Sequence, residues 1–303
     1  MTRPIEFAKL SGSGNDFICL DGRDGRFDEL LADPRRAGRF AQALCHRAMG
    51  VGADGVAFAV ACEIEGVADL GARHFEPDGG EADLCGNAMA CFVRWAGDDG
   101  WTTNHELRVL TAAGVVRGRH SDGQYVRVCI PLPEDMRAGL TVPADGEIWT
   151  CDYAVAGVPH LLAYVDDTAA VDVARLGALL RHHPMFAPRG VNANFVQVLR
   201  EGELALRTFE TGVEGETLAC GTGSAAAAIM AARRFGWDRA YLSGEKPVLI
   251  HARGGDVLRV YFELVGEAVR DLCLETVVRF LYRGTLHADL TAAATGAAGP
   301  GTA

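Results

Sequence analysis

A short pattern that occurs twice in the chain constrains its fold more than any other feature. Cys85-Gly86 and Cys220-Gly221 each follow a Phe-Glu pair and an acidic, glycine-containing turn, and each precedes a run of helix-forming residues. Two further pairs of segments resemble each other in the same order: Gly50–Val56 with Gly190–Val196, and Asn15–Asp21 with His160–Asp166. Three ordered matches predict two homologous halves, each carrying one of these cysteines.

Each of the two cysteines is expected at the N-terminus of a helix. After Gly223 the chain continues with small residues and good helix formers as far as Arg234, which predicts a buried helix that begins near Gly221. Unpaired N–H groups and the positive end of the helix dipole stabilise an anion there, either a bound carboxylate or the cysteine thiolate. The expected donors are the backbone N–H groups of Gly86, Asn87, Gly221 and Thr222.

Composition excludes several classes of protein. A net charge of −11, with Lys and Arg scattered along the chain, argues against a nucleic-acid surface. No apolar run approaches the roughly 18 residues of a membrane span, and the N-terminus lacks the apolar core of a signal peptide. We therefore expect a cytoplasmic protein that binds neither nucleic acid nor membrane. Its 303 residues are enough for two ordinary domains.

The number and spacing of the cysteines suggest no disulfide framework. Nine cysteines, an odd number without regular spacing, are expected to be thiols in a cytoplasmic chain and not disulfides. Cys19, Cys129 and Cys151 are flanked by strand formers and are read as small buried apolar residues. The chain contains no Cys-x-x-Cys and no His-x-x-x-His, so no metal site is expected.

The expected fold class is α+β, with two pseudo-symmetric domains that are each a curved, mostly antiparallel sheet wrapped around a central helix. Strands are predicted over 5–10, 16–20, 56–61, a pair within 64–76, 107–110, 114–119, 125–130, 149–155, 161–165, 194–199, 204–209, 248–252, 257–264 and 278–282, and helices over 34–49 and 173–182. A polar linker is predicted over 131–146. The expected domains are 1–131, completed by about 276–288, and 132–275, followed by a disordered tail over 289–303.

Two thiols facing one bound anion can move a proton from one face of a carbon to the other. A thiolate removes the proton and a thiol on the opposite side delivers another, which inverts the centre. The Cα–H of an amino acid is a very weak acid, so the developing carbanion needs donors placed against its carboxylate. No lysine motif of a pyridoxal enzyme is visible, so we expect no cofactor. Cys85 and Cys220 are therefore the candidate acid and base.

At these residues the chain resembles the diaminopimelate epimerases, which are pyridoxal-independent isomerases. The resemblance covers about residues 5–288 and is carried by Ser13–Phe17, Asp78–Glu81, Cys85–Asn87, Gly157–His160, Val191-Asn192, Glu210 and Gly215–Gly223. It implies two pseudo-symmetric domains with a cleft between them, Cys85 and Cys220 as acid and base, and His160 and Glu210 near them. It also implies substrate contacts by Asn15 and Asn192. From the residues alone, Asn15 either stabilises a turn or points to a ligand.

Three departures from the family's pattern concern the substrate. The family usually has Glu-Arg where this chain has Glu210-Thr211, and threonine cannot replace the bidentate contact that the arginine makes with the distal carboxylate. Glu76 stands where the family has asparagine, so two carboxylates would share one site. Val158 also replaces a frequent asparagine. These departures predict a substrate other than diaminopimelate, with a cationic or polar side chain, such as histidine or another basic amino acid.

Other functions stay open at this stage. Diaminopimelate epimerase is the main alternative, because another arginine would replace the missing contact. Glu76 itself either faces the substrate or pairs with Arg73 or Arg94. A cysteine hydrolase or acyltransferase would use one cysteine with His160 and give the other no role. A non-catalytic binding protein of the same fold is the third alternative. The expected partner is a small amino-acid substrate, and a homodimer stays open.

Overall fold

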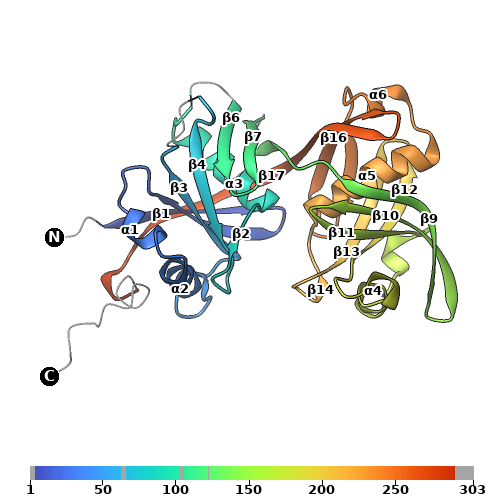
Figure 1. The fold of residues 1–303 in the computed structure, drawn as a ribbon, viewed down its shortest axis with the longest axis horizontal. Coiled ribbons are helices and arrows are strands. Elements are labelled where there is room, and N and C mark those ends of the chain that lie inside the picture. Colours follow the sequence, from blue (N-terminus) through green and yellow to red (C-terminus); the bar gives the residue numbers. More distant parts are fainter. Residues whose placement is uncertain (1–3, 63–65, 103–105, 122, 291–303) are drawn as a thin grey trace. The chain divides into compact units, whose positions relative to one another are not determined.

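The computed structural model describes residues 4–62, 66–102, 106–121 and 123–290. The chain forms two compact units: the first comprises Met1–Val128 with Val278–Ala303, and the second comprises Cys129–Val277. Each unit contains strands and its own helices (Figure 1). Over the described ranges, no helix is long and apolar enough to span a membrane.

In the first unit, strands of mixed direction pack on helix α3. The elements in chain order are β1 (Ile5–Gly12), β2 (Asn15–Asp21), α1 (Asp28–Leu31), α2 (Pro34–Cys45), β3 (Gly55–Val60), β4 (Leu70–Phe75), β5 (Glu81–Ala82), α3 (Gly86–Asp98), β6 (Glu106–Thr111), β7 (Gly114–His120) and β8 (Tyr125–Cys129). The pairs β1–β2, β3–β4, β4–β5, β6–β7 and β7–β8 are antiparallel, whereas β2–β3 and β4–β6 are parallel. The antiparallel run predicted after the first cysteine helix is confirmed.

The second unit repeats this order around helix α5. Its elements are β9 (Glu134–Ala144), β10 (Glu147–Ala156), β11 (Val158–Tyr164), η1 (Thr168–Ala170), α4 (Val173–Arg181), η2 (Pro184–Phe186), β12 (Asn192–Arg200), β13 (Glu203–Glu210), β14 (Gly215–Glu216), α5 (Gly221–Phe235), α6 (Arg239–Leu242), β15 (Val248–Ala252), β16 (Val257–Val265) and β17 (Ala268–Leu286). The pairs β10–β11, β12–β13, β13–β14, β15–β16 and β16–β17 are antiparallel, and β11–β12 and β13–β15 are parallel. The duplication seen in the sequence is thus a duplication of strand topology.

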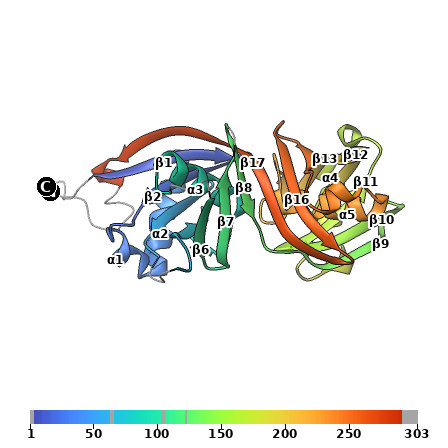
Figure 2. The ribbon, with the colours of Figure 1, turned by 90° about the horizontal axis from the view of Figure 1, so that it is seen from above.

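The long strand β17 contributes to both units. Its first part, Ala268–Glu275, pairs with β16, and its last part, Val278–Leu286, pairs with β1 (Figure 2). The strand predicted over 278–282 is therefore a piece of a 19-residue strand. β9 has the corresponding place in the second unit, because it follows β8 and pairs with β10.

Local sequence explains where α2 begins and ends. Asp33 accepts hydrogen bonds from the N–H groups of Arg35 and Arg36, and a proline occupies the first helical position. The helix ends at Cys45, earlier than the predicted 49. His46 has an extended conformation, and its Nδ1 accepts from the next turn, at Ala48 and Met49. The imidazole thus replaces the helical partners that a longer helix would have supplied.

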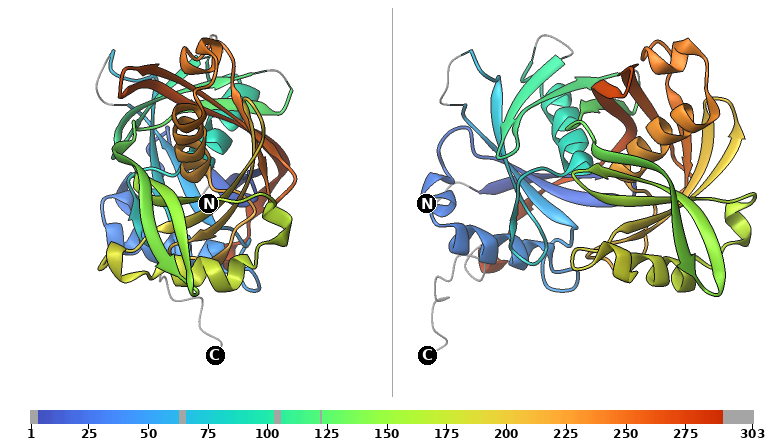
Figure 3. Two further views of the ribbon diagram at one scale, coloured as in Figure 1. Left: turned by 90° about the vertical axis from the view of Figure 1, so that its right-hand side faces the viewer. Right: turned by 45° about the vertical axis from the view of Figure 1, so that its right-hand side comes forward.

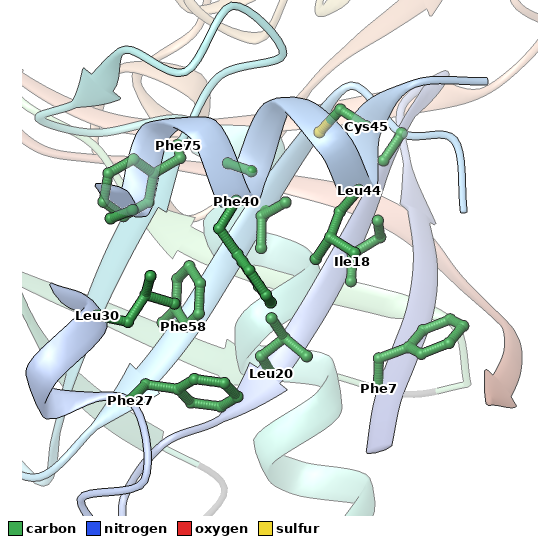
Figure 4. Close-up of a cluster of buried hydrophobic side chains, with 14 of the residues drawn as sticks. Phe7, Ile18, Leu20, Phe27, Leu30, Phe40, Leu44, Cys45, Phe58 and Phe75 are labelled. Carbon is green, nitrogen blue, oxygen red and sulfur yellow. The ribbon is translucent and has the colours of Figure 1, made fainter. Parts of the chain in front are cut away.

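The inner face of α2 packs on an aromatic cluster in the first unit (Figure 4). Phe58 lies at its centre, with its ring centroid 5.3 Å from that of Phe27 and 5.8 Å from that of Phe75, both edge to face. Phe40 reaches the cluster from α2. This core packs α2 against β3 and β4, and the chain continues from β4 toward Cys85.

Helix α5 is surrounded by strands of its own unit (Figure 3). All residues from Gly223 to Ala232 are buried, so the helix has no solvent-facing stripe. Its alanines let β9–β13, β15 and β16 approach closely. The helix ends at Gly236, whose φ of 60° is in the left-handed region. The predicted fold, a sheet wrapped around a central apolar helix, is confirmed for this unit.

Two predictions from the sequence, one about a linker and one about cysteines, are wrong. The segment predicted as a polar linker over 131–146 contains β9, which pairs with β10 and buries only Val142 completely. A strand with one buried position reads as a polar loop in sequence. The expectation of reduced cysteines also fails at one place, because Cys129 and Cys273 form a disulfide within the second unit. No spacing rule could pair two cysteines 144 residues apart.

Two predictions fall partly on residues that the structure does not describe. The strand pair predicted within 64–76 includes residues 64 and 65, which lie outside the described ranges, and the described remainder contains one strand, β4. The tail predicted over 289–303 lies outside the described residues from 291 onward.

Candidate active site

The two cysteines occupy the same position at the start of equivalent helices. Cys85 is the N-cap of α3, with φ −126° and ψ 117°, and Cys220 is the N-cap of α5, with φ −123° and ψ 110°. Both keep a reduced thiol, in contrast to Cys129 and Cys273. Cys85 is half-buried and Cys220 is buried. The first-turn N–H groups that follow each N-cap are those for which the sequence predicts anion binding.

In the first unit, Asn15 is tied to the helix that follows Cys85. Its Oδ1 accepts from Nδ2 of Asn87 at 2.8 Å, and its own Nδ2 donates to Oδ2 of Asp54 at 3.2 Å. The sequence left open whether Asn15 stabilises a turn or points to a ligand. Stabilising a turn does not account for these two bonds. The structure thus brings Asn15, at the start of β2, into contact with Asn87 in the first turn of α3.

A charged network that the sequence did not indicate stands behind Asn15. Arg47 bridges Asp16 and Asp54, with Nη2 at 2.9 Å and 2.6 Å from their carboxylates, and Nζ of the buried Lys9 lies 2.8 Å from Asp16. Burial alone would raise the pKa of Asp16, but the bonds from Arg47 and Lys9 hold it below its usual value. The network fixes Asp54, and through it the orientation of the Asn15 amide.

Glu76 pairs with a histidine and not with an arginine. Its Oε1 lies 3.1 Å from Nε2 of His74. Arg73 is held by Glu81, and Arg94 by Asp98 in the next turn of α3. The pairing of Glu76 with Arg73 or Arg94 that the sequence left open is therefore wrong. The sequence analysis did not single out His74, which lies on β4 two positions before Glu76 and belongs to no motif.

In the second unit, His160 is linked to Cys220 through Thr222. Nε2 of His160 lies 3.0 Å from the Thr222 hydroxyl, which lies 3.7 Å from the Cys220 sulfur. On its other side, Nδ1 of His160 lies 3.3 Å from the amide nitrogen of Asn194. His160, Asn194 and Cys220 are all buried. His160 is therefore near Cys220, as the resemblance implies.

Close packing holds this group together. A Cβ on Gly223 would lie 2.5 Å from Oδ1 of Asn194 and 3.3 Å from both the Cys220 sulfur and Nδ1 of His160. A glycine at this place lets the first turn of α5 approach the imidazole. The corresponding residue of α3, three positions after its cysteine, is Ala88.

Burial controls the protonation of this site. It raises the pKa of the Cys220 thiol to about 12, and the Glu210 carboxylate acts in the same direction. The N–H groups of Gly223 and Thr222 lower this pKa, but not enough to offset burial. Burial also raises the pKa of Glu210 and lowers that of His160 to about 3. At neutral pH, Cys220 is thus a thiol and His160 a neutral imidazole.

The remaining predicted substrate residues lie around β11, β12 and β13. Asn192 is buried, and its Oδ1 accepts the backbone N–H of Thr211 at 2.8 Å. Thr211 itself is exposed, and Val158 is 38% exposed. Arg189, which the sequence did not single out, is also exposed and donates to the carbonyl oxygen of Gly157, next to Val158.

Each unit therefore presents a cysteine at a helix N-terminus, donors for an anion and an ordered group of polar side chains. A carboxylate bound by the first-turn N–H groups would lie beside a sulfur that can carry a proton. The two units differ in the groups behind the helix, which are amides and a carboxylate in the first and a neutral imidazole in the second.

Comparisons with known proteins identify relatives of this chain. A sequence profile described as diaminopimelate epimerase matches residues 7–128 and 153–263. The chain is 35% identical to a diaminopimelate epimerase of Aquifex aeolicus (strain VF5), over 94% of this chain and 99% of that protein. It is 36% identical to a diaminopimelate epimerase of Methanocella arvoryzae, over 95% and 99% respectively.

Solved structures share the fold at low sequence identity. A phenazine biosynthesis protein of the PhzF family from Bacillus anthracis has a TM-score of 0.67 at 15% identity and covers 94% of this chain and 100% of its own. A hydroxyproline epimerase from Agrobacterium vitis has a TM-score of 0.67 at 16% identity, with 95% and 94% covered. They confirm the predicted fold class. With the profile and the relatives at 35% and 36% identity, they show that the chain belongs to the diaminopimelate epimerase family and is an isomerase of the epimerase and racemase type.

Proposed function

We propose that this protein is a cofactor-independent amino-acid epimerase or racemase that inverts Cα by proton transfer between Cys85 and Cys220. One observation carries the proposal: both cysteines are N-caps of equivalent helices, with backbone angles that agree within a few degrees. A hydrolase would need one such thiol, whereas inversion by two bases needs two. Inversion by two bases therefore gives the cysteine of each unit a role.

The proposed reaction starts with one thiolate and one thiol. Because burial keeps Cys220 protonated, we assign it the role of proton donor in the first half of the cycle, with Cys85 as the base. The base takes the Cα proton from one face while the thiol delivers its proton to the other, so one C–H bond breaks and one forms. The two sulfurs have then exchanged protonation states, and the reverse direction uses them in the opposite roles.

The substrate carboxylate is the proposed ligand of the helix N-termini. Negative charge develops on Cα and its carboxylate as the proton leaves, and donors fixed beforehand stabilise it without reorganising. The proposed site residues are the acid and base Cys85 and Cys220, their neighbours His160 and Glu210, and the substrate contacts Asn15, Glu76, Gly86, Asn87, Val158, Asn192, Thr211, Gly221 and Thr222.

We propose a substrate whose side chain is cationic or polar and not that of diaminopimelate. The Glu76 side chain is 43% exposed although it contacts His74, so the carboxylate can still attract a positive group. Thr211 uses its N–H for Asn192, and Val158 offers only an apolar side chain. These groups support a basic amino acid, such as histidine, more than a second carboxylate.

Diaminopimelate itself is the second candidate, and two observations favour it. The relatives reported above carry the name diaminopimelate epimerase. In addition, the exposed guanidinium of Arg189 is held at the carbonyl oxygen of Gly157, beside the position where the family's asparagine is replaced by Val158. Arg189 could take over the bidentate carboxylate contact that Thr211 cannot make.

The test is proton exchange in D2O. The full chain would be incubated with single enantiomers of histidine, lysine, arginine and ornithine and with LL-diaminopimelate, and Cα deuterium would be followed by mass spectrometry in substrate and product separately. Two bases predict that deuterium enters the product well before the remaining substrate. Equal early labelling of substrate and product would point to a single base and overturn the mechanism.

The same panel distinguishes the candidates. Exchange of a basic amino acid without exchange of diaminopimelate supports the main proposal. Exchange confined to diaminopimelate establishes the second candidate, and Arg189→Gln should then weaken the reaction with diaminopimelate. Lack of exchange across the whole panel would contradict both and leave the non-catalytic binding protein.

A further inference from the structure

We propose that Asn194 is a positioning residue that fixes His160 as the tautomer with its proton on Nε2, so that His160 acts on Cys220 as a hydrogen-bond donor through Thr222 and not as a base. This inference deepens the proposed function and rests on it for its catalytic meaning. The contacts that carry it all lie within the second unit, between β11, β12, β13 and the first turn of α5.

The orientation of the Asn194 amide is determined by its surroundings. Its Nδ2 lies 3.0 Å from the carbonyl oxygens of both Leu161 and Asn192, which can only accept. Its Oδ1 lies 2.9 Å from the hydroxyl of Thr208, which donates to it. Turning the amide over would place oxygen against two oxygens, so nitrogen must face β11.

This orientation dictates the tautomer of His160. Nδ1 of the imidazole lies 3.3 Å from Nδ2 of Asn194, an amide nitrogen that can donate a hydrogen bond but cannot accept one. A proton on Nδ1 would meet another N–H, so Nδ1 must be the lone-pair nitrogen. His160 is completely buried and neutral, and its single ring proton is therefore on Nε2.

The proton on Nε2 then orders the hydroxyl of Thr222. Nε2–H donates to Oγ1 of Thr222 at 3.0 Å, so this oxygen acts as acceptor toward the imidazole. Its own hydrogen can be directed to the Cys220 sulfur at 3.7 Å. A hydroxyl hydrogen aimed at sulfur stabilises the thiolate that forms when Cys220 gives up its proton. The chain of donors runs from Thr208 through Asn194, His160 and Thr222 to Cys220.

The experiment reads the tautomer directly. Full-length protein with 15N-labelled histidine is examined by two-bond 1H–15N correlation NMR, and His160 is assigned by the loss of its signals in His160→Gln. We expect a protonated Nε2 and an unprotonated Nδ1 from about pH 8 down to about pH 5. A proton on Nδ1, or an equal mixture of the two tautomers, would overturn the inference.

Two variants on β12 sharpen the test. Asn194→Leu keeps the approximate shape of the side chain but removes the NH2 group, so the proton should no longer be confined to Nε2 and turnover should fall about tenfold or more, since one hydrogen bond to the sulfur is lost. Gln197→Met makes the same kind of change on the same strand, where the Gln197 Oε1 accepts from Thr168, and should leave tautomer and turnover unchanged. A proton that stays on Nε2 alone in Asn194→Leu would overturn the inference.

The NMR result does not depend on substrate, so it separates this inference from the proposed function. The predicted tautomer without exchange of any amino acid would leave the positioning of His160 intact and contradict the enzyme proposal. Alkylation of Cys220 by iodoacetamide, measured on the Cys220 peptide, tests whether the Thr222 hydroxyl affects the Cys220 sulfur. Thr222→Val should shift the pH profile of this alkylation to higher pH, whereas an unshifted profile would show that the hydroxyl does not act on the sulfur.

Discussion

In the first unit a partly exposed, charged network lies next to the start of the Cys85 helix, whereas in the second unit a buried, neutral network lies next to the start of the Cys220 helix. Asn15 leads to Asp54 and on to Arg47, which is 62% exposed. His160 leads to Asn194, and both are buried. The duplicated fold thus preserves the placement of the cysteine but not its electrostatic surroundings.

This difference teaches how one pattern can supply both partners of an acid and base pair. Two identical sites would favour the same protonation state in both thiols, but inversion by two bases needs one thiol and one thiolate. Burial of the second site keeps Cys220 protonated. The half-buried Cys85 lies in a more exposed environment. The predictions below test this contrast, from the largest expected effect to the smallest.

The largest effects are expected from the two cysteines themselves. Cys85→Ser and Cys220→Ser should each reduce racemisation by roughly 10²- to 10⁴-fold, the usual contribution of a positioned acid or base. The measurement is steady-state turnover from each enantiomer. Cys62→Ser, which changes a partly exposed cysteine outside the proposed site, serves as the control and should leave turnover unchanged. Full turnover in either site variant would contradict two-base inversion.

Substrate preference should respond next. Changing Glu76→Asn together with Thr211→Arg should raise the preference for diaminopimelate over a basic amino acid by roughly 10- to 100-fold, the value of one charge-assisted hydrogen bond to a carboxylate. Relative kcat/KM values measure this change. Thr211→Lys adds the charge without the bidentate geometry and should give a smaller gain. An unaltered preference in the double variant would mean that these two positions do not discriminate between substrate side chains.

The space beside each helix start provides a stability test. Gly223→Ala should lower the free energy of unfolding by about 1–3 kcal/mol, because its Cβ would lie 2.5 Å from Oδ1 of Asn194. Ala88→Gly at the equivalent place in α3 should cost only about 0.5–1 kcal/mol, the usual cost of glycine in a helix. Urea unfolding measures both. Equal losses would show that the two helix starts are packed alike.

The smallest effect is a pH dependence of stability. The folded pKa of His160, about 3, is below its ordinary value of 6.5, so the unfolded chain takes up a proton first and stability is lost as pH falls from about 6.5 toward 3. At about pH 5.5 this loss amounts to about 1.4 kcal/mol relative to neutral pH.

The comparison that isolates this loss is the difference in unfolding free energy between about pH 7.5 and about pH 5.5. That difference should be smaller by about 1.4 kcal/mol in His160→Gln than in the wild type. His287→Gln changes an exposed imidazole and should keep the wild-type difference. A wild-type difference in His160→Gln as well would mean that His160 titrates alike in the folded protein and in the unfolded chain.

Local pattern was enough to predict much of the fold. The spacing of apolar residues and the turn-forming glycines located most strands, and the Cys-Gly pairs located the starts of α3 and α5. The repeat predicted that the two units have one topology. Prediction from local pattern failed where the deciding feature was not local. β9 buries only Val142 fully, and the disulfide joins Cys129 to Cys273 across 144 residues.

The sequence by itself determined the family, the duplication and the two cysteines, because helix starts and reactive residue types are written in short contiguous motifs. Tertiary structure alone decided the partners of those motifs. Asn194 reaches His160 through neighbouring parallel strands, and Glu76 pairs with His74 instead of a nearby arginine. It also decided protonation, because the pKa of a thiol or an imidazole depends on burial, and burial is a property of the whole packed unit and not of any segment.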